Sequence, residues 1–133
     1  MTAGPSEPGG SEERERVVDK PWGHERIWTE TDRYVGKVLL IRAGRRLSLQ
    51  YHEIKDESIL VLRGRLRLHL AGADGTVEVT EIGPGEHRRV RPGVVHRYEA
   101  GEDDLELIEV STPELDDVIR LEDDFGREGT SAP

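Results

Sequence analysis

Short apolar segments separated by Gly, Pro or Asp recur along the chain from Val17 onward. The clearest alternation runs from Arg65 to Leu70, where Leu occupies every second position, as in a strand with one buried face. Shortly after this segment, residues Ala73 to Thr76 contain Asp-Gly. This dipeptide is a hairpin signal, because glycine accepts the positive φ of a tight turn. The pattern predicts many short strands, in the segments RIW, YVGKVLLI, RLSLQYH, SILVL, RLRLHLA, TVEVTEI, VVHRYEA and LELIEV.

The spacing of the apolar residues also predicts the fold class. No segment before Pro113 has helical periodicity, so nothing is available to cover a parallel sheet. An all-β antiparallel sandwich, jelly roll or small barrel fits best. After Pro113, the segment ELDDVIRLEDDFGRE is expected to form a helical turn or an irregular strap that docks through its apolar side chains.

A chain of 133 residues is long enough for one domain and too short for two of ordinary size. Residues 1–16 have no large apolar side chain after Met1, so we predict a disordered arm there. The folded domain is predicted to span residues 17–128, and residues 129–133 are predicted to be a disordered C-terminus. No apolar run approaches the roughly 18 residues of a membrane span, and no signal peptide is apparent, so we expect a cytoplasmic protein.

Charge and composition narrow the possible partners and chemistry. Asp and Glu outnumber Lys and Arg by 28 to 19, a formal net charge of -9, which argues against nucleic acid or an anionic membrane as partner. The excess is uneven, because residues 42–97 hold 11 basic and 7 acidic side chains, whereas residues 101–128 hold 2 and 12. A small anionic ligand therefore fits the body of the domain. The chain has no cysteine, so potential metal ligands are His, Asp, Glu and Gln.

Four such residues are expected to converge. Gln50 and His52 are two apart on a predicted strand, so they point to the same face. Glu57 follows across a polar break, where the chain can turn and bring the carboxylate back towards His52. His96 lies after a Pro-Gly turn at the start of another strand, and in a closed antiparallel fold these strands can meet.

This arrangement resembles the cupin signature, in which a glycine, a pair of ligands two apart, a glutamate and a closing glycine precede a later histidine. Its members here are Gly44, Gln50, His52, Glu57, Gly64, Gly85, Gly93 and His96. The chain further resembles the C-terminal isomerase domain of bifunctional mannose-1-phosphate guanylyltransferase/mannose-6-phosphate isomerases. The matching segments are KPWG (residues 20–23), LSLQYH (47–52), VVHR (94–97) and VIRLEDDFGR (118–127).

The resemblance implies a cupin double-stranded jelly roll that interconverts mannose 6-phosphate and fructose 6-phosphate with the help of a divalent metal ion. Zinc is the first expectation, with manganese, nickel, cobalt or iron as alternatives. The expected metal ligands are Gln50, His52, Glu57 and His96. A divalent metal ion can polarise a sugar carbonyl, which makes the adjacent C–H easier to deprotonate. The resemblance also implies a homodimer.

For the phosphate of such a substrate, the candidate ligands are Lys37, Lys55 and Arg97. Lys37 stands where the family has a lysine, and Arg97 follows the metal histidine. On a regular strand, however, Arg97 alternates outward from His96. Spacing alone does not identify the residue that moves the proton.

Departures from the family leave two other functions open. Ile54 replaces a family histidine and Lys55 replaces an arginine, which is consistent with a non-catalytic, metal-loaded barrel that binds a sugar. His52, Glu57 and His96 alone form a two-histidine, one-carboxylate set that holds Fe(II) in dioxygenases, although Gln50 argues against this reading. The sequence has no Gly-rich nucleotide loop, so guanylyl transfer is not expected.

Overall fold

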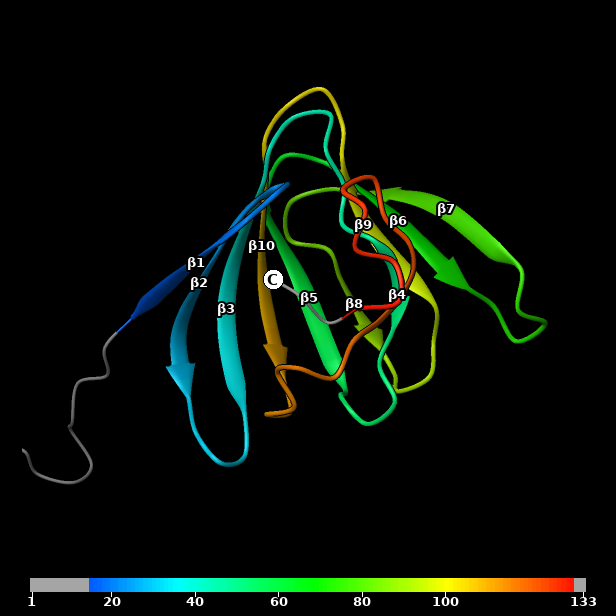
Figure 1. Cartoon of the computed structure of the whole chain (residues 1–133). Coiled ribbons are helices and arrows are strands. Elements are labelled where there is room, and N and C mark those ends of the chain that lie inside the picture. Colours follow the sequence, from blue (N-terminus) through cyan, green and yellow to red (C-terminus); the bar gives the residue numbers. More distant parts are fainter. Residues whose placement is uncertain (1–14, 131–133) are drawn as a thin grey trace, which may run out of the picture.

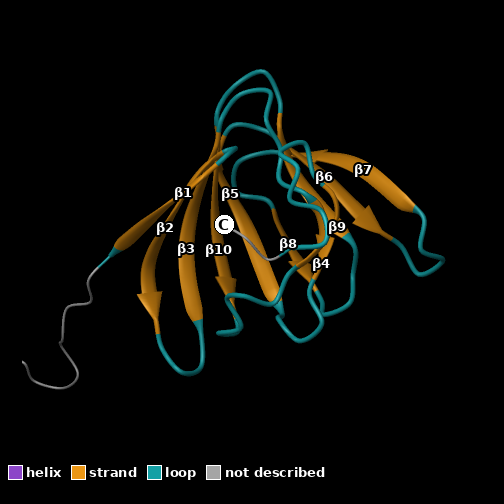
Figure 2. Cartoon of the chain, viewed as in Figure 1, coloured by secondary structure: helices purple, strands orange, loops and turns teal. Residues whose placement is uncertain are grey.

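A computed structural model describes residues 15–130, which form two antiparallel sheets packed face to face (Figure 1). The described part contains no helix, and therefore no helix that could cross a membrane (Figure 2). The strands are β1 (Arg16–Lys20), β2 (Gly23–Glu30), β3 (Val35–Ile41), β4 (Leu49–Tyr51), β5 (Glu57–Arg63), β6 (Leu66–Ala71), β7 (Val77–Ile82), β8 (His87–Val90), β9 (His96–Ala100), β10 (Leu105–Ser111) and β11 (Ile119–Glu122).

One sheet has the strand order β1-β2-β3-β10-β5-β8 and the other β11-β4-β9-β6-β7. Both orders join strands that are far apart in the sequence, as in a jelly roll. Alternate side chains of both sheets face inward and form one core. Its fully buried members include Leu39, Ile59, Leu68, Tyr98 and Leu107. The predicted all-β, antiparallel architecture is confirmed.

The predicted segments correspond to eight of the strands, from β2 to β7 together with β9 and β10. The predicted hairpin joins β6 to β7, and Gly75 there has a φ of 84°. The sequence pattern missed β1, β8 and β11. The helical turn considered after Pro113 is wrong, because Ile119–Glu122 pairs with β4 as a strand. Four residues are too few to show the alternation of a strand in the sequence, so only the pairing with β4 identifies this segment as a strand.

The domain is slightly longer than the sequence indicated at both ends. Most of the predicted arm (residues 1–16) and of the predicted C-terminal tail (residues 129–133) lies outside the described residues, which exclude 1–14 and 131–133. Arg16, placed in the arm by the sequence, begins β1. At the other end, the Gly129 N–H donates to the Arg120 carbonyl at 2.9 Å, and the Thr130 hydroxyl donates to the Arg127 carbonyl at 2.8 Å. Residues 129 and 130 are therefore held against the domain.

Glycine is required where the ligand-bearing strands begin and end. Gly64, which follows β5, has a φ of 85°, and an added Cβ would lie 2.4 Å from the Asp104 carbonyl oxygen. Gly93, in the turn before β9, has a φ of 84° and donates its N–H to the His52 carbonyl at 2.6 Å. Because L side chains rarely adopt such φ values, both turns favour glycine, and the Gly93 turn joins the start of β9 to His52.

Candidate metal centre and adjoining cavity

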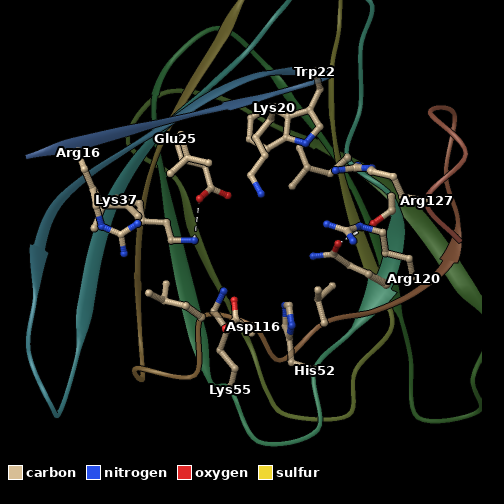
Figure 3. A pocket seen from close by; sticks show the side chains of 17 residues that line it. Arg16, Lys20, Trp22, Glu25, Lys37, His52, Lys55, Asp116, Arg120 and Arg127 are labelled. Carbon is tan, nitrogen blue, oxygen red and sulfur yellow. Dashed lines mark hydrogen bonds and ion pairs between the residues drawn. The ribbon is translucent and has the colours of Figure 1, made fainter. Parts of the chain in front are cut away.

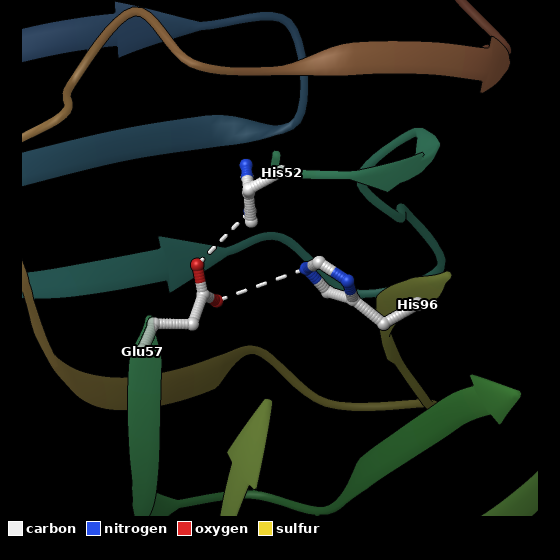
Figure 4. A group of neighbouring side chains, drawn as sticks. All are labelled: His52, Glu57 and His96. Carbon is white, nitrogen blue, oxygen red and sulfur yellow. Dashed lines mark ion pairs between the residues drawn. The ribbon is translucent and has the colours of Figure 1, made fainter. Parts of the chain in front are cut away.

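Three buried side chains meet inside the barrel (Figure 4). His52 follows β4, Glu57 is the first residue of β5 and His96 is the first residue of β9. Each offers one ligand atom, and these atoms all lie within 4.8 Å of one another. The Nε2 atoms of His52 and His96 are 3.0 and 3.8 Å from the two Glu57 carboxylate oxygens. The convergence expected from the sequence therefore exists in the fold.

Backbone carbonyls fix the orientation of both histidine rings. His52 Nδ1 lies 2.5 Å from the Asp117 carbonyl oxygen, and His96 Nδ1 lies 2.9 Å from that of Val94. A carbonyl only accepts, so the hydrogen bonds place a proton on each Nδ1. Each Nε2 is then left with its lone pair directed at Glu57. Metal-binding histidines are held in this way, with the second ring nitrogen donating to a carbonyl.

The ligand atoms that face one another have no hydrogen-bond partner. His52 Nε2, His96 Nε2 and one oxygen of Glu57 are buried and have no hydrogen bond. Burial lowers the pKa of His96, which favours the neutral, metal-binding imidazole. Three unsatisfied lone pairs in a dry interior are unfavourable, and a cation among them would satisfy all three. The residues present fit a divalent metal ion.

A charged network lies behind the carboxylate. Lys55 Nζ is 3.3 Å from Glu57 and 3.1 Å from Glu109, and the Tyr98 hydroxyl donates to Glu57 at 2.5 Å. Burial alone raises the pKa of Glu57, but the Lys55 ammonium holds it well below its ordinary value. Burial alone lowers the pKa of Lys55, but Glu109 and Glu57 raise it overall. The three charged groups sum to -1, which a dication would change to +1.

Gln50, the fourth expected ligand, stands beside this set. Its Cα pairs with that of His96 across β4 and β9, so the two side chains share a face. The Gln50 amide oxygen accepts a hydrogen bond of 2.6 Å from the Ser48 hydroxyl. A carbonyl oxygen has two lone pairs, so one remains for another partner.

A cavity of about 420 Å³ opens next to His52 (Figure 3). This volume lies within the range of about 300 to 1,000 Å³ typical of small-molecule sites. Six Lys or Arg side chains line the cavity, against two acidic ones, Glu25 and Asp116. The cavity is therefore strongly positive inside a chain whose formal net charge is -9.

The structure separates the three expected phosphate ligands. Lys37 and Lys55 both line the cavity, and both are already paired with carboxylates, Lys37 with Glu25 at 3.0 Å. Arg97 lies outside the cavity, because alternation along β9 turns its side chain away from that of His96. Its guanidinium is buried against the Leu47 carbonyl, to which Nε donates at 2.9 Å.

The structure also adds cavity residues that sequence reasoning did not select. Lys20 at the end of β1, Arg120 in β11 and Arg127 beyond it all contribute to the wall (Figure 3). They belong to the segments KPWG and VIRLEDDFGR, which carried the family resemblance, so a signal was present. Their strands lack the alternation that would have shown which side chains face inward.

A C-terminal segment packs against the loop that follows His52. The Asp117 carboxylate accepts hydrogen bonds from the backbone N–H groups of Glu53, Ile54 and Lys55, at 3.0, 2.7 and 2.9 Å. Burial raises the pKa of Asp117, but these three N–H groups lower it overall. Asp117 thus ties residues 53–55 in place with its side chain and orients His52 with its carbonyl. Ile54, in place of the family histidine, is 66% exposed.

Comparisons with known proteins identify the family of the chain. Residues 10–123 match the family described as Mannose-6-phosphate isomerase C-terminal. The chain is 35% identical over 116 residues to the mannose-1-phosphate guanylyltransferase ManC of Salmonella typhimurium, covering 84% of this chain and 23% of that protein. The chain thus spans about a quarter of the length of this relative.

Solved structures share the fold at low identity. The capsular polysaccharide assembling protein CapF from Staphylococcus aureus, a cupin, has a TM-score of 0.73 and 19% identity, over 84% of this chain and 33% of CapF. KdgF from Halomonas sp. has a TM-score of 0.66 and 21% identity, over 74% of this chain and 88% of KdgF. The cupin fold expected from the motif is confirmed.

Proposed function

The chain belongs to the mannose-6-phosphate isomerase C-terminal family, and from this premise we propose that it is a metal-dependent isomerase that interconverts mannose 6-phosphate and fructose 6-phosphate. The guanylyl transfer in the name of its relatives is not part of the proposal. The observation that supports it most is the junction of the metal centre with a strongly positive cavity, since His52 belongs to both.

In this proposal, His52, Glu57 and His96 hold the metal ion, and Gln50 supplies its amide oxygen as a fourth ligand. When bound, the ion supplies a Lewis acid that polarises the sugar carbonyl. Asp117 and Val94 keep both imidazole rings in the metal-binding tautomer. The positive cavity holds the phosphorylated sugar and replaces bulk water around the reacting carbons.

Conversion of an aldose to a ketose also needs a group that moves a proton between carbons 1 and 2. We assign this role to Glu25, one of the two carboxylates that line the cavity. Lys37 holds its carboxylate at 3.0 Å, whereas the other, Asp116, is exposed. A carboxylate within reach of the substrate can accept the proton from one carbon and return it to the next.

The test combines metal analysis with an anaerobic isomerase assay. We expect about one divalent metal ion per chain, lost in His52→Ala, Glu57→Ala and His96→Ala, and conversion of mannose 6-phosphate but not mannose. Unchanged metal content in two of the three variants would exclude the site. Glu25→Gln is expected to keep the metal and abolish exchange of the carbon 2 hydrogen with deuterated solvent. Retained exchange in this variant would remove Glu25 from its role.

Two other results would replace the proposed reaction. Activity that requires dioxygen would indicate an iron dioxygenase built on the same His52, Glu57 and His96 set. Tight binding of the sugar phosphate without turnover would indicate a binding module. Ile54, where the family has a histidine, is the observation in favour of that second outcome.

A further inference from the structure

Three cations line one end of the cavity, and they differ from the three that the sequence indicated. We propose that Lys20, Arg120 and Arg127 form the subsite that binds the phosphate group of the substrate. The identity of the substrate rests on the proposed function above. The assignment of the subsite rests on the contacts of these side chains.

Arg120 is the central observation. Its side chain is buried, with 7% exposure, and it makes no ion pair with any residue in the range 15–130. Its Nη1 donates to the Thr130 carbonyl at 2.8 Å, but its Nε is buried and has no hydrogen-bond partner. Asp123 and Glu25 act on its charge only from beyond ion-pair distance. A buried guanidinium without an ion-paired carboxylate is unfavourable, so this geometry is suited to receive an anion.

The two neighbouring cations add to this positive end. Lys20 is half-buried and has no ion pair among the described residues. Burial lowers its pKa, and the positive charges of Lys37, Arg120 and Arg127 lower it further, although Glu25 opposes them. Arg127 is held by Asp123 through bonds of 2.7 and 3.1 Å, while its Nη1 is buried and unpartnered. Arg120 Nε and Arg127 Nη1 thus have no hydrogen-bond partner, and the Lys20 ammonium has no ion pair among the described residues.

Sheet register places this end at a useful distance from the metal centre. Arg120 pairs with Gln50 across β11 and β4, and Gln50 pairs with His96 across β4 and β9. The three residues therefore form one row across the sheet and point to the same face. With neighbouring strands about 4.8 Å apart, the backbones of Arg120 and His96 are roughly 10 Å apart. A hexose 6-phosphate has its reacting carbons at one end and its phosphate at the other. It could therefore place the reacting carbons beside His96 and the phosphate beside Arg120.

The chemistry of the three groups favours a phosphate over a neutral hydroxyl or a single carboxylate. A phosphate monoester carries close to two negative charges near neutral pH and several acceptor oxygens. The planar guanidinium groups of Arg120 and Arg127 match such oxygens, and Lys20 adds a mobile charge. Lys37 and Lys55, in contrast, each already face a carboxylate at 3.0 to 3.3 Å.

The test measures binding separately from turnover. Inorganic phosphate and mannose 6-phosphate are titrated by calorimetry into the wild type, Arg120→Gln and Lys20→Gln, with Arg67→Gln as control. Arg67 lies on the outer face of β6 and is exposed. Its substitution by Gln removes one positive charge, as the cavity substitutions do. We expect both ligands to bind the wild type and the control equally, and to bind each cavity variant about tenfold or more weakly. Circular dichroism and melting curves confirm that each variant is folded.

The outcomes distinguish the subsite from the reaction. Equal phosphate affinity in folded Lys20→Gln, Arg120→Gln and the wild type would overturn the subsite, even if isomerisation is observed. No binding of either ligand to the wild type would overturn it as well. Loss of binding in the cavity variants alone would support the subsite even if the wild type does not turn over mannose 6-phosphate, and in that case the proposed reaction would be wrong.

Discussion

Lys55 is the residue whose removal tests the charge network behind the metal centre. Its ammonium is buried and lies 3.1 Å from Glu109 and 3.3 Å from Glu57. Lys55→Met keeps most of the side-chain volume and removes the charge. Two buried carboxylates then face each other without their cation. We therefore expect Lys55 to act as a structural cation first, and its loss to be visible without any substrate.

The size of the effect follows from the burial of the network. Removing one partner of a buried ion pair lowers the free energy of unfolding by about 3 to 5 kcal/mol, because the remaining charge is left uncompensated. A domain of this size has a total of about 5 to 15 kcal/mol, so the loss amounts to at least about a fifth of it. In the wild type the pKa of Glu57 is depressed on folding. Its contribution is present above its ordinary value of 4.5 and is lost as the pH falls through the folded value. The difference between wild type and variant should therefore shrink in acid.

The assay is urea unfolding at neutral and acidic pH, with chelator and with Zn²⁺. In chelator we expect the full loss at neutral pH. With Zn²⁺ the loss should be smaller, because the ion compensates the charge of Glu57. In the variant the ion is also not repelled by the Lys55 ammonium, so the variant is expected to bind the metal more tightly than the wild type. Lys37→Met, which removes a single pair with the cavity-facing Glu25, should lose less. A loss below about 1 kcal/mol in chelator, or a larger loss with Zn²⁺ than without, would show that Lys55 does not compensate these carboxylates.

Three further predictions concern the surroundings of the metal centre and the chain terminus. Tyr98→Phe removes the buried hydrogen bond to the metal-centre carboxylate and should lower the free energy of unfolding by about 1.5 to 3 kcal/mol in urea titrations; a change below about 0.5 kcal/mol would contradict that role. Asp117→Ala should speed amide hydrogen exchange across residues 53–55, whereas Asp116→Ala, its exposed neighbour, should not; equal exchange in the two variants would show that the loop is held otherwise. Deleting residues 1–14 should leave the melting temperature unchanged, since they contain no large apolar side chain after Met1, and a decrease of several degrees would show that they pack on the barrel.

The convergence of the candidate metal ligands was predictable in part, because Gln50, His52 and Glu57 obey short-range rules. Gln50 and His52 are two apart and share a face by the strand period, and the polar break before Glu57 reverses the chain. His96 was recognised from the motif, since no local rule links it to residues more than forty positions earlier. The structure brings it to His52 through the pairing of β9 with β4, with Gln50 opposite His96.

The positive end of the cavity was not predictable in the same way. Arg120 and Arg127 come from the most acidic part of the sequence, where residues 101–128 hold 2 basic and 12 acidic side chains. A charge count averages over both faces of a strand, whereas a cavity collects only the side chains that point inward. Arg97 illustrates the converse, because it lies in the more basic part of the chain and yet faces away from the cavity.

The all-β fold class, the spacing of the candidate metal ligands and the glycine turns beside them could be predicted from the chain alone, because period and turn chemistry act over a few residues. Which strand faces meet across the barrel depends instead on pairings between distant segments. Those pairings gave Lys37 and Lys55 carboxylate partners, whereas Arg120 and Lys20 form no ion pair within the described residues. The reason is physical: alternation states that two residues share a face, but the energy of a buried charge depends on what the opposite strand places against it.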